Sequence, residues 1–191
     1  KEMNIDADLF VPVPSSGVAA SQGYSKESGI PYADGILRNR YIGRTFIQPT
    51  QEMRDLKVRM KLNPIKKILK GKDIILIDDS IVRGTTSKQI INRLRETGVN
   101  NIHMAIASPP VKNPCYYGLD TSRRQELIAR KKETEEIASY IGADTLNYLS
   151  LEGLLSVLDA DGYGYCTACF NGVYPTEEEY KREVDHNGVI L

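Results

Sequence analysis

The residues with the clearest chemical potential are two adjacent carboxylates, Asp78 and Asp79, followed by Gly84, Thr85 and Thr86. Adjacent carboxylates accept hydrogen bonds from neighbouring hydroxyl groups and can also bind Mg²⁺. A glycine and two threonines at the start of a helix suit a phosphate, because free backbone N–H groups point out of that end. The pattern therefore indicates a ligand in which a sugar diol lies next to a phosphate. An ordinary turn with helix-capping side chains is the alternative, and it would be favoured for an Asp-Asp pair alone.

The elements that must position these groups are a strand and a helix. Residues 74–77 are four consecutive apolar residues, which is typical of a strand buried on both faces. Residues 87–95 carry apolar side chains at helical spacing, and Gly98 is suited to a helix end. In open α/β sheets ligands bind beyond the carboxyl ends of strands, where this turn is expected. A Walker A loop is excluded, because no lysine follows a glycine at the required spacing.

A second strand, loop and helix are predicted near the start of the chain. Residues 8–13 favour a strand, Pro14, Ser15, Ser16 and Gly17 a loop, and residues 18–28 a helix. This arrangement predicts a second phosphate site. The alternative is a simple turn that leads into a helix, and the loop taken alone favours that alternative.

A basic segment follows, in which Arg38, Arg40 and Arg44 alternate with Tyr41 and apolar residues without a regular period. One interpretation is a basic surface hairpin. The other is a flexible lid over the active site, because arginines suit phosphate oxygens and a closed lid keeps water from a reactive centre.

The rest of the pattern alternates strands with helices, which predicts an α/β fold with a central, mainly parallel sheet flanked by helices. The further expected strands are residues 32–37, 101–107 and 146–149. The further expected helices are residues 51–61, a short helix from Asn63-Pro64 to about Gly71, and residues 123–140 and 151–158.

The composition limits the possible functions. The 191 residues are enough for one domain with a substantial core. The 25 basic and 25 acidic side chains cancel, which gives no support for non-specific nucleic-acid binding. No apolar run is long enough for a membrane span and no signal peptide opens the chain, so we expect a cytoplasmic protein without a membrane partner. The start at Lys1, close to a strand, indicates a piece of a longer protein.

Three cysteines are present: Cys115, and the pair Cys166 and Cys169 in a Cys-x-x-Cys arrangement. An odd number argues against a closed disulfide framework. The pair alone is compatible with a metal site, a redox pair or chance. No second pair and no suitable histidine completes a zinc site.

The segment Ile-Asp-Asp-Ser-Ile-Val-Arg-Gly-Thr-Thr, residues 77–86, closely resembles the phosphoribosyl pyrophosphate (PRPP) signature of type I phosphoribosyltransferases. In this form it resembles the amidophosphoribosyltransferase family. Residues 39–49 are similar to the flexible loop of that family, which orders over bound PRPP. The segments around the cysteines are similar to those of the Bacillus-type members. The resemblance extends from about residue 8 to residue 175.

The resemblance implies a type I phosphoribosyltransferase fold with a flexible active-site lid. Residues 1–159 would form the phosphoribosyltransferase domain, truncated at its N-terminus, and residues 160–191 a cysteine-containing extension and tail. The family's N-terminal glutaminase domain would be absent from this chain. The implied reaction transfers ammonia derived from glutamine to C1 of PRPP, releasing pyrophosphate and forming 5-phosphoribosylamine, the first step of de novo purine biosynthesis. Another type I phosphoribosyltransferase, a non-catalytic PRPP-binding regulator and a fragment that folds without binding are the alternatives.

The resemblance also implies roles for individual residues. Contacts to PRPP are implied for Asp78, Asp79, Ser80, Arg83, Gly84, Thr85, Thr86, Ser15, Ser16 and Gly17, although the family carries an acid at the position of Ser15. Coordination of Mg²⁺ is implied for Ser16, Asp78 and Asp79, and a catalytic role for Arg38, Arg40, Tyr41 and Arg44 of the lid. Ligation of a 4Fe–4S cluster is implied for Cys115, Cys166 and Cys169, with the fourth cysteine outside this chain. Feedback inhibition by AMP, GMP and ADP and a homotetramer are implied as well.

Overall fold

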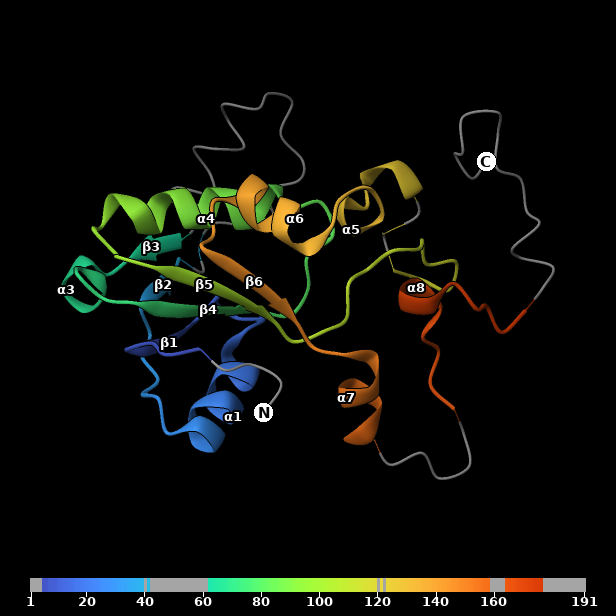
Figure 1. Ribbon diagram of the computed structural model, residues 1–191, viewed down its shortest axis with the longest axis horizontal. Helices are drawn as coiled ribbons and strands as arrows, with labels where there is room; N and C mark the ends of the chain where they lie inside the picture. The colour runs from blue at the N-terminus through green and yellow to red at the C-terminus, as the bar shows by residue number, and fades with distance from the viewer. Residues whose placement is uncertain are drawn as a thin grey trace.

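A computed structural model describes residues 5–39, 41, 62–119, 121, 123–158 and 164–176. Its centre is a four-stranded sheet of β1 (Leu9–Pro12), β4 (Ile74–Asp78), β5 (Ile102–Ile106) and β6 (Thr145–Tyr148). The strand order is β1-β4-β5-β6, and every neighbouring pair is parallel (Figure 1). The predicted α/β fold with a mainly parallel sheet is confirmed.

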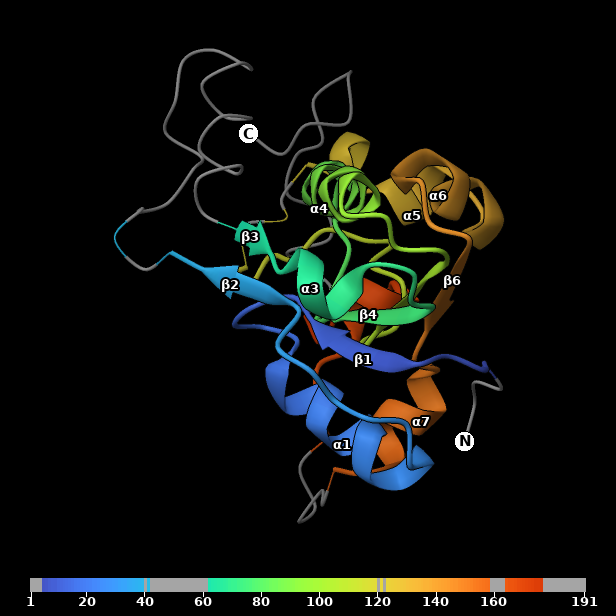
Figure 2. The same cartoon turned by 90° about the vertical axis from the view of Figure 1, so that its left-hand side faces the viewer.

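Helices cover both faces of this sheet. Figures 1 and 2 show α4 (Thr85–Glu96) and α6 (Thr134–Ile141) on one side, and α1 (Val18–Ser28) and α7 (Leu151–Ser156) on the other. Within the described part of the chain, no helix is long and apolar enough to cross a membrane.

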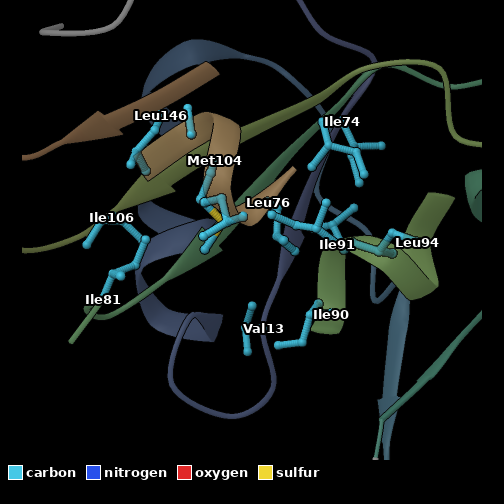
Figure 3. Close-up of a cluster of buried hydrophobic side chains, with 14 of the residues drawn as sticks. Val13, Ile74, Leu76, Ile81, Ile90, Ile91, Leu94, Met104, Ile106 and Leu146 are labelled. Carbon is cyan, nitrogen blue, oxygen red and sulfur yellow. The ribbon is translucent and has the colours of Figure 1, made fainter. Parts of the chain in front are cut away.

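The core explains why β4 is apolar throughout. Ile74 and Leu76 face α4 and α6, where they pack in one cluster with Ile91, Leu94 and Met104 (Figure 3). The alternate residues of β4 face α1 instead, in a second cluster with Phe10 and Ala105. Each fully buried aliphatic side chain contributes roughly 1.5–3 kcal/mol, so the central strand is held from both faces. The apolar positions predicted for α4 are those that the structure buries.

The region after α1 differs from the prediction. The observed strand is β2 (Ile36–Arg38), which pairs antiparallel with β3 (Leu62–Pro64). The predicted strand 32–37 begins too early, because Tyr32 makes only an isolated bridge to Phe10. The predicted helix start at Asn63-Pro64 is wrong, since both residues belong to β3 and α3 (Lys66–Leu69) begins after them. Pairing with a distant strand has overridden the local preference of proline for a helix start.

The predicted helix 123–140 is wrong as one continuous helix, although α6 (Thr134–Ile141) occupies its second half. The chain instead forms the 3₁₀ helix η2 (Arg124–Glu126), the short α5 (Ile128–Lys131) and α6. Leu127 is extended, with φ −79° and ψ 107°, because the next N–H donates to the carbonyl of Val82 at 2.9 Å. Glu133 then starts α6 through a reciprocal capping box with Glu136. The predicted helix 51–61 lies outside the described residues.

Candidate functional site

Two loops meet at the carboxyl edge of the sheet. The first, residues 13–17, leads from β1 into α1, and the second, residues 79–84, leads from β4 into α4. They are adjacent because Pro12 and Ile77 are partners in the parallel β1–β4 pair. The N–H of Val13 donates to the carbonyl of Ile77 at 2.8 Å, which fastens the first loop to the end of β4. Both segments that the sequence predicted for phosphate binding therefore occupy one place.

Gly17 packs tightly against the end of β4. A Cβ atom built at Gly17 would lie 2.1 Å from the carbonyl oxygen of Ile77 and 3.0 Å from the nitrogen of Val13. The φ of Gly17 is −79°, which any residue can adopt, so lack of space is what requires glycine here. Gly17 also begins α1, so this contact places the helix N-terminus beside the end of β4.

Ser16 and Asp78 join the first loop directly to the last residue of β4. The Ser16 hydroxyl donates to Asp78 Oδ1 at 2.7 Å, and Asp78 is only 8% exposed. Burial raises the pKa of Asp78 from 3.8 to about 6, and the charge of Asp79 adds to the increase. The hydrogen bonds from Ser16 and from the Asp79 N–H oppose that increase. Asp78 is therefore an acid whose ionised form lacks full compensation in the unliganded protein.

Asp79 differs from its neighbour. Its side chain is exposed, and one oxygen accepts a hydrogen bond from the Ser80 hydroxyl at 3.0 Å. Its backbone N–H donates to Asp78 Oδ1 at 2.9 Å, which helps to orient the Asp78 carboxylate. Together with Ser16 they offer oxygen ligands only, which suits Mg²⁺. Within the described ranges, no three His, Cys, Asp or Glu side chains lie close enough together to hold a metal. The fit is therefore to an ion that a phosphate-bearing ligand helps to coordinate.

Gly84 shapes the second loop. It has φ 74°, in the left-handed region, and it is the N-cap of α4. A Cβ at Gly84 would lie 3.1 Å from Ile128 Cδ1 and 3.2 Å from Tyr140 Cε1, so the loop is packed from behind. Thr85 and Thr86 open α4 and are both exposed. The loop thus presents two hydroxyls and the first N–H groups of a twelve-residue helix, as the sequence predicted.

Arg83 has a partner that the sequence did not indicate. Its Nε donates to Glu126 Oε2 at 2.6 Å, and its Nη2 contacts the same oxygen. Glu126 lies in the stretch of residues 123–140 that the sequence predicted only as a helix, so no local signal distinguished it. The predicted contact of Arg83 with PRPP stays a prediction, and in the unliganded protein its guanidinium faces Glu126.

The described part of the basic segment reaches the first loop. Arg38 Nη1 donates to the Ser15 hydroxyl at 2.8 Å. Tyr41 is fully exposed, and its N–H donates to Asn39 Oδ1 at 3.0 Å. Arg40 and Arg44 lie outside the described residues, as does most of the predicted lid. Of the two predicted lid residues that the structure describes, Arg38 therefore contacts the first loop.

The third group of predicted site residues is the cysteines, of which Cys169 lies in α8 (Ala168–Asn171). The carbonyl of Cys169 accepts hydrogen bonds at 2.9 Å from the N–H groups of Lys112 and Asn113, which brings the segment of Cys115 alongside. Burial raises the pKa of the Cys169 thiol, and the thiols of Cys115 and Cys166 raise it further. All three thiols are free of disulfides. Thiolates are the ligands that iron–sulfur clusters use, but a 4Fe–4S cluster normally takes four of them. Among the residues that the structure describes, these three thiols do not lie close enough together to hold a metal.

The chain is similar in sequence to proteins of known families. A family model described as a phosphoribosyl transferase domain matches residues 1–128. An amidophosphoribosyltransferase from Synechocystis sp. is 56% identical over 175 residues, which are 92% of this chain and 35% of the relative. The chain thus spans about a third of the length of this curated relative.

Two solved structures are similar over nearly the whole chain. One is the glutamine PRPP amidotransferase from Bacillus subtilis complexed with ADP and GMP, with a TM-score of 0.81 and 47% identity. The match covers 99% of this chain and 41% of the Bacillus subtilis chain. The other is described as the allosteric regulatory enzyme of purine biosynthesis, with the same TM-score and identity, and it covers 99% of this chain and 40% of that chain.

Proposed function

This chain belongs to the phosphoribosyl transferase domain family, and from this premise we propose that it binds PRPP together with Mg²⁺ at the carboxyl edge of the sheet. The observation that carries the proposal is the hydrogen bond of 2.7 Å between Ser16 and Asp78. It holds the loop that leads into α1 beside the end of β4. The carboxylate pair lies there, and the loop that leads into α4 follows it. A ligand with phosphate groups at both ends and a diol in the middle matches that arrangement.

Each part of PRPP has a counterpart in the site. The 5′-phosphate would take the N–H groups and hydroxyls at Gly84, Thr85 and Thr86. The ribose hydroxyls would donate to Asp78 and Asp79. The pyrophosphate would lie on the loop of residues 15–17, which Arg38 already contacts through Ser15. Mg²⁺ would neutralise pyrophosphate charge, with Ser16, Asp78 and Asp79 as the nearest protein oxygens.

We further propose the amidophosphoribosyltransferase reaction, because curated relatives at up to 56% identity carry that name. The nitrogen of ammonia forms a bond to C1 of PRPP, and the bond from C1 to the pyrophosphate oxygen breaks with its electron pair on pyrophosphate. The product amine loses one proton. The sugar carries positive charge during this exchange, so the protein contributes mainly positioning and a fixed negative field from Asp78 and Asp79.

Several partners belong to the same proposal. In the whole protein a glutaminase domain would supply ammonia from glutamine. Purine nucleotides such as AMP, GMP and ADP would act as feedback inhibitors, in line with the ADP and GMP named for the Bacillus subtilis structure. Cys115, Cys166 and Cys169 would provide three ligands of a 4Fe–4S cluster, and a cysteine outside this chain the fourth. The assembly would be a homotetramer, and residues 1–159 and 160–191 the two parts of this chain.

Isothermal titration with PRPP and Mg²⁺ tests the binding proposal on the protein at its natural length. Asp79→Asn should weaken binding by about tenfold to a hundredfold, since a hydrogen bond to a charged group contributes roughly 1.5–3 kcal/mol. Glu135→Gln is the matched control, because it also removes one exposed carboxylate, in the first turn of α6. Equal affinity in wild type and Asp79→Asn would contradict the placement of the ribose.

A further inference from the structure

We propose that the segment of residues 124–129 positions the phosphate loop, which we define as residues 79–86, and that Glu126 and Ile128 are positioning residues for phosphate binding. This inference rests on the proposed function, because it concerns the site assigned to the 5′-phosphate. Three independent contacts connect the segment to the loop, and each uses a different kind of interaction.

The first contact is between backbones. The N–H of Ile128 donates to the carbonyl of Val82 at 2.9 Å. The segment itself is anchored in the core, since Leu127 is 0% exposed and Ile128 and Ala129 are also buried. A loop tied to a buried segment loses freedom that it would otherwise have to give up on binding a ligand. The fixed carbonyl of Val82 thus restrains the residue two positions before the N-cap of α4.

The second contact is packing against the N-cap itself. The side chain of Ile128 lies behind Gly84, where its Cδ1 would be 3.1 Å from a Cβ atom. Tyr140 of α6 approaches the same point, at 3.2 Å. Gly84 is therefore held between two elements while its φ of 74° turns the chain into α4. This packing sets the direction of the first N–H groups of the helix, which are the groups assigned to the phosphate.

The third contact is the ion pair of Arg83 with Glu126. Both Nε and Nη2 of Arg83 approach Oε2 of Glu126, while Arg123 Nη1 lies 3.5 Å from Oε1. Side chains of the pair are 42% and 31% exposed, so water screens the attraction only in part. The ion pair directs the side chain of Arg83, the residue before Gly84, toward the segment of residues 124–129. The role of this cation is to hold the loop, and the phosphate is left to backbone N–H groups and threonine hydroxyls.

The three contacts restrain only the loop that would bind the 5′-phosphate end of PRPP. The segment contacts the loop after β4, whereas the loop after β1 is held by Ile77 and Asp78. Loss of the ion pair should therefore weaken binding of a 5′-phosphate and leave binding of pyrophosphate unchanged. A partly exposed ion pair corresponds to about a two- to fivefold change in affinity.

Two probes separate these ends in titrations of the full-length protein. Ribose 5-phosphate carries the phosphate and diol but no pyrophosphate, and pyrophosphate with Mg²⁺ carries the other end alone. Glu126→Gln should bind ribose 5-phosphate about two- to fivefold more weakly and bind Mg-pyrophosphate as wild type does. Arg83→Met should behave in the same way. The double variant should bind ribose 5-phosphate no more weakly than the single variant with the lower affinity. The control Glu135→Gln should change neither probe.

Unchanged or tighter binding of ribose 5-phosphate by Glu126→Gln would overturn the inference, because Glu126 would then only withhold Arg83 from the phosphate. Equal weakening of both probes would overturn it as well, since a general loss of structure acts on both loops. If wild type binds neither probe, the proposed function fails, and hydrogen exchange then decides the inference alone. Faster exchange of the Ile128 N–H in Arg83→Met and Glu126→Gln supports the positioning role, and unchanged exchange overturns it.

Discussion

The Ser16 hydroxyl donates a hydrogen bond of 2.7 Å to Asp78, although the two residues are 62 positions apart in the chain. The bond joins the loop after β1 to the end of β4, next to the point where the second loop begins. It is also the main polar compensation for a carboxylate that is 8% exposed. The negative charge of Asp78 therefore does not stabilise the folded protein when no ligand is bound.

Asp78→Asn should therefore stabilise the unliganded protein. The pKa of Asp78 rises from 3.8 to about 6 on folding, so the ionised form is disfavoured in the native state. The penalty is absent when both states are protonated, below pH 4, and complete above about pH 6, where both are ionised. We expect the free energy of unfolding of the variant to exceed that of wild type by up to about 3 kcal/mol at pH 7, and by progressively less toward pH 4.

Urea denaturation of both proteins at pH 4.5, 6 and 7.5 measures this difference. The same variant should bind PRPP and Mg²⁺ at least about tenfold more weakly, since a carboxylate is replaced by a neutral amide. A variant that is less stable than wild type at every pH would show that Asp78 is a structural residue. Gains in stability with losses in binding are expected of a functional residue.

Gly17→Ala should damage the first loop. The new methyl group would stand 2.1 Å from the Ile77 carbonyl oxygen, so β1, β4 or α1 must shift. Overpacking of this kind costs about 1–3 kcal/mol, and binding of Mg-pyrophosphate should be lost with it. Gly23→Ala in the same helix is the control, because nothing lies within 4 Å of its Cβ position. That change should stabilise the protein by about 0.5–1 kcal/mol in thermal unfolding. Similar effects of the two substitutions would refute the close packing of Gly17.

Arg38→Met should weaken Mg-pyrophosphate binding by roughly tenfold, because the variant removes the cation that contacts Ser15. Arg38→Lys keeps the charge without the planar fork and should show an intermediate affinity. Lys67→Met removes a positive charge from α3 and should have no effect. Identical titrations for Arg38→Met and Lys67→Met would mean that Arg38 does not reach the ligand.

A separate prediction concerns the three cysteines, Cys115, Cys166 and Cys169. Anaerobic reconstitution of the full-length protein with iron and sulfide should produce broad visible absorption. Cys166→Ser and Cys169→Ser should each abolish it, since the proposed cluster needs a thiolate from each of these residues. Iron content measured alongside gives an independent readout. A colourless wild type that retains zinc would contradict the cluster.

The sequence predicted the strand and helix on either side of the carboxylate pair better than it predicted the surrounding structure. The stretch from Ile74 to Thr86 carries its own signals, because a strand buried on both faces, an acidic turn and an amphipathic helix all have local patterns. β3 lacks such a pattern, since Asn63 and Pro64 become a strand only through pairing with β2. The break at Leu127 likewise depends on the hydrogen bond from the Ile128 N–H to the carbonyl of Val82, which lies far earlier in the chain. Glu126 was missed for that reason.

Pyrophosphate release from PRPP tests the central claim most directly. Full-length protein, Mg²⁺ and ammonium at alkaline pH, where free NH₃ is available, should release pyrophosphate. The release should depend on ammonium, and Asp78→Asn should reduce it by at least about tenfold, as expected for loss of a charge-assisted hydrogen bond. Glu135→Gln should retain the wild-type rate. Absence of ammonium-dependent release from a wild type that still binds PRPP, or an equal rate in Asp78→Asn, would contradict the account.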